Sequence, residues 1–148
     1  GAILTYGSET YFLLEHGDFE IYLGYTLTNA KKKYDAVHPN VSLSARNKFA
    51  SVLGYEFSEH FRAIFELACT GKQYLDDGGL TPSFPFAAAM LRYDTGPFTF
   101  VLNCENLFDY RQTRKESIVL PPSTDPRFKQ LWAPIDGRVV NLSIKIKL

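Results

Sequence analysis

Apolar and polar residues alternate strictly along four stretches of the chain. The first begins at Phe19, the second at Phe61 and the third at Phe98, and the fourth closes the sequence from Val140 to Leu148. The apolar positions of the four stretches are Phe19, Ile21, Leu23, Tyr25, Leu27; Phe61, Ala63, Phe65, Leu67, Cys69; Phe98, Phe100, Leu102, Cys104; and Val140, Leu142, Ile144, Ile146, Leu148. A period of two places these side chains on one face of a β-strand, whereas a helix would scatter them. Four strands are therefore predicted.

Three further segments predict strands with weaker contrast, at residues 9–16, 48–57 and 86–94. Several of the seven strands run about 9–11 residues, which is the length that a tilted strand needs to cross a bilayer. Soluble strands are typically about five or six residues long.

The connections between the strands alternate between short and long. Tight turns are expected at residues 16–18, 58–60 and 95–97, and long loops at residues 31–47, 75–85 and 107–137. Short periplasmic turns and long outer loops are typical of a barrel that meanders across an outer membrane. With seven strands the N-terminus lies at the outer surface and Leu148 in the periplasm. Complete bacterial barrels have an even strand number, so a piece of a larger barrel is expected.

Composition narrows the function classes. The 148 residues are 45% hydrophobic and 15% aromatic, which argues against disorder. Sixteen basic residues balance sixteen acidic ones, which disfavours a nucleic-acid partner. No apolar run is long enough for a transmembrane helix. Cys69 and Cys104 lack a metal or redox spacing and are expected to be small buried apolar residues.

Several segments resemble one known family. Asn106-Leu107-Phe108-Asp109 resembles the Asn-Leu-Phe-Asp motif near the C-terminus of TonB-dependent outer-membrane receptors. As in that family, a last extracellular loop, Gly137-Arg138-Val139-Val140 and an alternating final strand follow it. Thr70-Gly71-Lys72-Gln73-Tyr74, at the end of an expected strand, is similar to the family as well. The resemblance covers essentially the whole chain.

The resemblance implies an all-β fold, an antiparallel meander of about seven strands from the C-terminal part of a transmembrane β-barrel of about 22 strands. Residues 1–148 would then be barrel wall without a plug domain, in a bacterial outer membrane. Such receptors import scarce nutrients, chiefly ferric siderophores and other metal chelates. The implied partners are the rest of the barrel and its plug, membrane lipid, TonB through the missing plug, and the barrel-assembly machinery. Self-association of the isolated fragment is also expected, because its edges and apolar face are uncovered.

The last strand of these barrels usually ends in an aromatic residue that the assembly machinery reads. This chain ends in Leu148, while the alternating positions match the expected signal. The assembly signal assigned by resemblance is Val140, Leu142, Ile144, Ile146 and Leu148. An ordinary amphipathic edge strand would show the same pattern. In the motif, Asn106 and Asp109 can bond nearby backbone groups, and Leu107 and Phe108 can anchor the strand end at the membrane interface.

No catalytic, cofactor or metal site is expected, and an enzyme is the least favoured class. His16, His38 and His60 are dispersed, and Asp76-Asp77-Gly78-Gly79 lacks the further ligands of a calcium loop. Two basic groups in the outer loops are candidate contacts for an anionic ligand or for lipopolysaccharide phosphates, although a solvated loop rim is the simpler explanation and is favoured. These residues are Lys31, Lys32, Lys33, Arg111, Arg114 and Lys115.

Two other functions fit the alternation. A soluble ligand-binding β-barrel would turn its apolar face inward, and a complete small outer-membrane barrel would need one more strand. If the chain is part of a membrane barrel, the side chains expected to face the lumen are Glu20, Arg62, Glu66, Asn103, Lys145 and Lys147.

Overall fold

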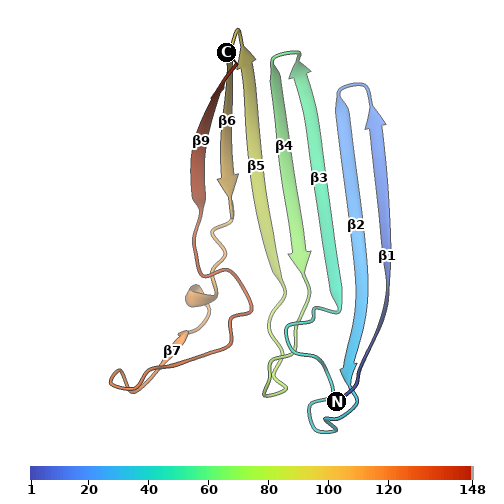
Figure 1. Ribbon diagram of the computed structural model, residues 1–148, viewed down its shortest axis with the longest axis vertical. Helices are drawn as coiled ribbons and strands as arrows, with labels where there is room; N and C mark the ends of the chain where they lie inside the picture. Colours follow the sequence, from blue (N-terminus) through green and yellow to red (C-terminus); the bar gives the residue numbers. More distant parts are fainter. Residues whose placement is uncertain (148) are drawn as a thin grey trace.

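The computed structural model describes residues 1–147, and seven long strands make up most of it (Figure 1). They are β1 (Ile3–His16), β2 (Phe19–Lys32), β3 (Asn47–Ser58), β4 (Phe61–Thr70), β5 (Phe84–Thr95), β6 (Phe98–Glu105) and β9 (Val139–Ile146). The seven form one sheet in the order β1-β2-β3-β4-β5-β6-β9, with every neighbouring pair antiparallel. The predicted all-β meander of seven strands is confirmed.

Tight turns gather at one end of the sheet and long loops at the other (Figure 1). The N-terminus lies at the loop end and β9 finishes at the turn end. Gly17 and Gly96 sit in two of the turns with φ of 57° and 54°. Glycine suits these positions because a Cβ atom disfavours the left-handed region.

The strands extend beyond their predicted bounds, because the alternation weakens near the loops while the backbone pairing continues. β1 starts at Ile3 rather than at residue 9, and β2 runs to Lys32. The last long loop also contains structure that the sequence did not predict. It holds a short 3-10 helix, η1 (Gln112–Arg114), and a hairpin of β7 (Val119–Leu120) and β8 (Arg127–Phe128).

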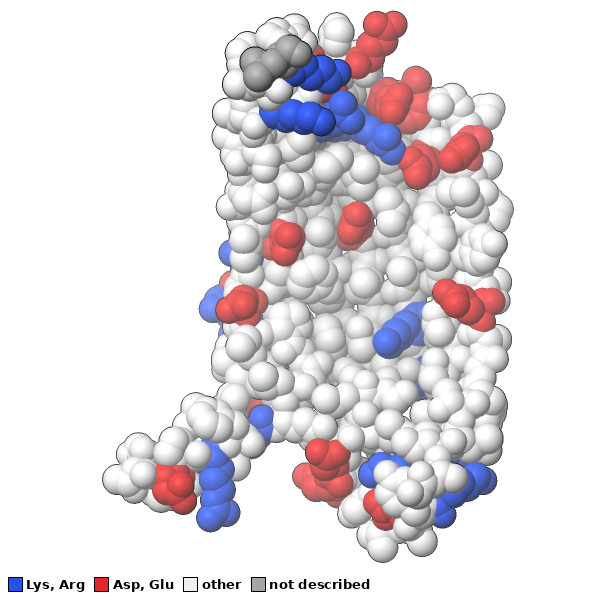
Figure 2. Space-filling model, in the orientation of Figure 1, with Lys and Arg blue, Asp and Glu red and all other residues white. Residues whose placement is uncertain are grey.

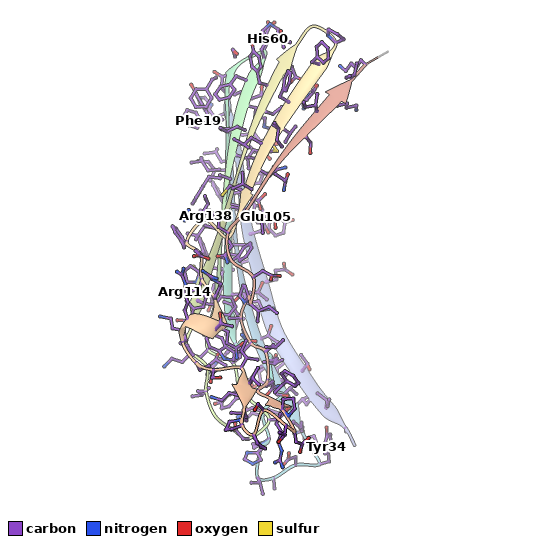
Figure 3. The ribbon with its side chains drawn as sticks, turned by 90° about the vertical axis from the view of Figure 1, so that its left-hand side faces the viewer. Phe19, Tyr34, His60, Glu105, Arg114 and Arg138 are labelled. Carbon is purple, nitrogen blue, oxygen red and sulfur yellow. The ribbon has the colours of Figure 1, made fainter. Side chains whose placement is uncertain are left out.

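The sheet is a single open layer. Seen edge-on it is bowed, with side chains on both sides and no second sheet against it (Figure 3). The buried apolar residues of the described chain are Ala45, Ala87 and Trp132. Leu142 remains 62% exposed, so the alternate apolar set does not pack into a core of its own. Among residues 1–147 no helix is long and apolar enough to cross a bilayer.

Cys69 and Cys104 form no disulfide in this structure, and both are half-buried. The expectation that they are buried is wrong, because a single layer shields a strand residue only through its neighbours. Asp76-Asp77-Gly78-Gly79 forms a turn, as expected, in which the Gly79 amide donates to Asp77 Oδ1 at 2.8 Å.

We expect Gly17→Ala to lower the free energy of unfolding by about 1–2 kcal/mol, because alanine resists the left-handed backbone of the first turn. Space is not the cause, since a Cβ atom at Gly17 would meet nothing within 4 Å. Gly54→Ala, in the middle of β3, is the matched control and should be nearly neutral, because its Cβ atom would make ordinary contacts. Urea denaturation measures both, and an equal loss in the two variants would refute the explanation.

Candidate functional site

The register of the strands sorts their side chains onto two chemically different faces. Residues paired directly across an antiparallel ladder point to the same face of the sheet. One complete row comprises Leu14, Ile21, Leu53, Phe65, Ala89, Cys104 and Val140, with one residue from each strand. We call the face that bears this row the apolar face. The opposite face is the polar face.

Charge is almost confined to the polar face. The pairings place twelve charged strand residues there, namely Glu9, Glu15, Glu20, Lys32, Lys48, Glu56, Arg62, Glu66, Arg92, Asp94, Glu105 and Lys145. Of the described strand residues, Lys31 alone brings an acidic, lysine or arginine side chain to the apolar face, at the loop end of β2. Phe19 and Glu105 accordingly lie on opposite sides of the sheet (Figure 3).

Aromatic side chains mark both ends of the apolar face. At the turn end, Phe19 contacts Tyr55 with ring centroids 4.4 Å apart, and Phe57 continues the cluster at 4.6 Å from Tyr55. At the loop end, Tyr25 Oη donates to Asn47 Oδ1 at 2.7 Å, and Asn29 Nδ2 donates to Tyr6 Oη at 2.8 Å. Most residues of the paired rows between the two groups are aliphatic, with Phe12 and Phe65 among them.

The polar face carries ion pairs near the turn end. Arg62 Nη2 lies 2.6 Å from Glu20 Oε2, and Arg62 Nη1 lies 3.4 Å from Glu56 Oε1. Arg92 Nε pairs with Asp94 Oδ2 at 2.8 Å. Figure 2 looks onto this face, where charged side chains gather toward the turn end and are sparse over the middle. The register brings Glu20, Arg62, Glu66, Asn103 and Lys145 onto this one face, while Lys147 follows the end of β9.

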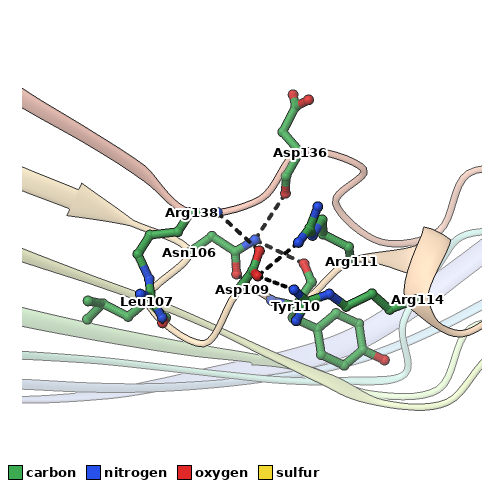
Figure 4. Close-up of polar contacts among 8 residues, drawn as sticks. All are labelled: Asn106, Leu107, Asp109, Tyr110, Arg111, Arg114, Asp136 and Arg138. Atoms are coloured by element: carbon green, nitrogen blue, oxygen red, sulfur yellow. Dashed lines mark hydrogen bonds and ion pairs between the residues drawn. The ribbon is translucent and has the colours of Figure 1, made fainter.

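The Asn106–Asp109 motif forms a clamp at the base of the last loop (Figure 4). Asn106 is 2% exposed and has a φ of 49°, a left-handed conformation that asparagine tolerates. Its Nδ2 donates to the carbonyls of Tyr110 at 2.9 Å and Asp136 at 3.1 Å, and its Oδ1 accepts from the Tyr110 amide at 2.9 Å. One side chain thereby joins the two ends of the loop.

Asp109 holds the other half of the clamp. Its Oδ2 pairs with Arg111 at 2.9 Å and with Arg114 at 2.6 Å, and its Oδ1 accepts from the Arg138 amide at 3.3 Å. Desolvation by itself would raise the pKa of the Asp109 carboxyl, but Arg111 and Arg114 outweigh it and hold that pKa below its ordinary value. The motif is thus bonded to nearby backbone as the sequence suggested. Leu107 is half-buried, and Phe108 is 57% exposed.

The structure does not bring the candidate basic residues together. Lys31 and Lys32 end β2, whereas Arg111, Arg114 and Lys115 lie across the loop end of the sheet, beyond β6 (Figure 1). Most of them also have partners within the chain. Lys32 Nζ lies 3.5 Å from Asp35, and Lys115 Nζ lies 5.7 Å from the centre of the Tyr110 ring.

Gln112 organises the last loop, although no sequence motif marks it. It is 0% exposed, its Oε1 accepts from the Trp132 amide at 2.9 Å, and its Nε2 donates to the Gln130 carbonyl at 3.0 Å. Glu116 accepts from Trp132 Nε1 at 2.8 Å and pairs with Lys129 at 2.6 Å. The hydrogen bond from Lys129, followed by that from Trp132, lowers the pKa of the Glu116 carboxyl.

Two adjoining hollows mark the polar face beside the last loop. One, of about 270 Å³, lies over β4–β6 and is lined partly by Ile64, Glu66 and Ala88. The other, of about 400 Å³, lies beneath the last loop, and the two share Phe86 and Glu105. No group of three or more metal-binding side chains occurs within residues 1–147.

We expect Gln112→Ala to destabilise the last loop by about 1–3 kcal/mol, because buried donors and acceptors lose their partner. Trp132 is the only tryptophan of the chain, so its fluorescence reports on this loop directly. Gln130→Ala, which removes one exposed bond to the Asp76 amide, should have a smaller effect. Equal effects of the two substitutions would show that Gln112 has no special role.

Acidification should loosen the same loop through Glu116. Folding lowers the pKa of the Glu116 carboxyl from its ordinary 4.5. The ionised carboxyl therefore stabilises the folded loop fully above pH 4.5, and this stabilisation is lost as pH falls through the lowered pKa of the folded state. Trp132 emission should shift to the red in that range. Glu116→Gln should abolish the transition, and a variant that titrates like the parent chain would assign it to another group.

Comparison with known protein families and with curated proteins finds no match for this chain.

Proposed function

We propose that this chain is a section of the wall of a bacterial outer-membrane transport barrel. The observation that carries the proposal is the separation of charge in a sheet without a second layer. The apolar face would contact lipid and the polar face would line the lumen. Polar lumen and lipid-facing apolar residues alternate along the strands of such barrels.

The dimensions of the apolar face support a bilayer as its surroundings. Along β2, the loop-end aromatic group extends from Tyr25, six residues from Phe19, to the level of Asn29, the partner of Tyr6, ten residues from Phe19. At about 3.3 Å per residue the outer margins of the two groups are about 33 Å apart along the strand, or about 25 Å of height at a tilt of about 40°. Outer-membrane barrels carry an apolar band about 25 Å tall between aromatic girdles.

The strand directions imply that this sheet closes into a barrel only together with further strands. β1 and β9 are the two edges of the sheet, and both run from the loop end to the turn end. Direct closure would pair them in parallel. An antiparallel barrel therefore needs an odd number of further strands between these two edges.

A soluble barrel is less well supported. Its apolar face would have to enclose a core, and here that face is open and carries aromatic residues at both ends. The assignment to TonB-dependent receptors rests on the resemblance of the Asn106–Asp109 motif, and so does a metal chelate as the cargo. The clamp supports it by giving each polar residue of the motif a structural task in holding the last extracellular loop.

The proposal predicts that adjacent positions of β3 differ sharply in their tolerance of charge. Leu53→Arg would place a guanidinium in lipid and should cost about 2–4 kcal/mol of folding free energy in phosphatidylcholine vesicles. Val52→Arg would place it in the lumen, directly opposite Tyr22 on β2 and Glu66 on β4, and should cost little. Urea titration of vesicle-inserted chains measures both.

The matched pair also tests the alternative. In a soluble barrel, Leu53→Arg would be equally harmful, but the chain would fold in buffer without lipid. Folding that needs no vesicles, or equal cost at Leu53 and Val52, would contradict the proposed wall function.

A further inference from the structure

The two adjoining hollows of the polar face form one groove, and Ala88 lies at the centre of its first part. Glu66 lies directly opposite Ala88, and Glu105 follows Cys104, whose partner Ala89 follows Ala88. Glu66 and Glu105 therefore stand on β4 and β6 at either side of Ala88. Two strand spacings of about 4.8 Å put their Cα atoms about 10 Å apart. Because alanine projects so little, the space between the two carboxylates is open.

The floor of this groove is apolar. Ile64, Phe86 and Met90 surround Ala88, and no lysine or arginine lines either of the two hollows. Within residues 1–147, Glu66 and Glu105 make no ion pair. The carboxylates of Glu20, Glu56 and Asp94 on the same face do have arginine partners, whereas Glu9 and Glu15, on the edge strand β1, have none among the described residues. The groove thus keeps negative charge of the kind that arginine neutralises beside Glu20, Glu56 and Asp94.

The groove continues toward the outer loops. The second hollow shares Phe86 and Glu105 with the first and runs beneath the last loop past Leu131 and Ile135 to Asp136. Asp136 adds a third acidic residue to the lining. A small molecule arriving at the loop end would meet this path before it met the ion pairs near the turn end.

We propose that the groove binds a small organic cation, an ammonium or guanidinium group carried on an apolar body. The cation would lie between Glu66 and Glu105, and the body would cover Ala88, Phe86 and Met90. Charge complementarity and the apolar floor select this chemistry, because an anionic ligand would be repelled from the same site. The inference rests on the proposed wall function, which makes this face the lumen. It restricts the cargo to compounds, metal chelates included, that bear such a group.

The test uses the chain inserted in phosphatidylcholine vesicles and a series of probes with one fluorophore. Dansylcadaverine carries an ammonium group, dansylamide is neutral and dansylglycine is anionic. We expect saturable binding of dansylcadaverine alone, above its partition into protein-free vesicles. The double variant Glu66→Gln/Glu105→Gln should weaken that binding by about tenfold or more.

Two further variants separate a groove from a merely acidic surface. Ala88→Phe keeps both carboxylates and fills the space between them, so it should weaken binding as well. Glu59→Gln removes the same charge from an exposed tight turn and should leave binding unchanged. Equal binding by the parent chain and the double variant would overturn the proposal. So would full binding by Ala88→Phe, or binding of a short lysine-rich peptide without binding of the small cation.

Protease protection of the inserted strands shows whether the chain has entered the vesicles, and it thereby separates failure of the proposed wall function from failure of the cation site alone. The isolated section is expected to insert as self-associated copies whose edges pair, because lipid does not tolerate an open sheet edge. A parent chain that does not insert even at concentrations where its copies associate would contradict the wall function, and the inference would fall with it. Chains that insert normally but bind the three dansyl probes alike would overturn the cation site alone.

Discussion

The confinement of charge to one face of a single-layer sheet is the constraint on which the rest of this structure depends. Pairing satisfies the backbone of the sheet between its edges, so hydrogen bonding does not distinguish the two faces. Side-chain chemistry distinguishes them. Rows such as Leu14, Ile21 and Leu53 meet no second layer of protein in this structure, so their burial requires apolar surroundings from outside the chain. In the proposed wall a bilayer would supply such surroundings, and it would also require that a charge like Glu66 face the other way.

The packed part of the chain lies outside the sheet, in its long loops. Trp132 is buried there, and Gln112 bonds the amides of Trp132 and Ala133 and the carbonyl of Gln130. Gln73 Nε2 reaches from the neighbouring loop to the Trp132 carbonyl at 3.2 Å. Asn106 fixes the base of this assembly. The arrangement is coherent for the proposed wall section, in which lipid and further strands would stabilise the sheet while the long loops hold their own shape. Some apolar residues of these loops stay exposed, such as Phe128 at 70%.

Much of the fold could be predicted from the sequence, for physical reasons that differ by element. The strands that begin at Phe19, Phe61 and Phe98 were predictable because one face excludes polar residues and the other does not. The first half of β1 was missed since the polar residues Ser8 and Thr10 interrupt the apolar set on its apolar face. The β7–β8 hairpin and the role of Gln112 were beyond prediction, because they depend on contacts between residues far apart in the sequence. The clamp at Asn106 was predicted only as local backbone bonding, and its link to Asp136 needed the folded loop.

The most direct test of the account is which side chains of β9 touch lipid. In a Trp132→Phe background, single tryptophans placed from Val140 to Ile146 would be quenched by lipids with brominated acyl chains. The account predicts strong quenching at Val140, Leu142, Ile144 and Ile146, and weak quenching at Asn141, Ser143 and Lys145. Quenching without a period of two, or with the opposite phase, would contradict the claim that the apolar face of this sheet faces a membrane.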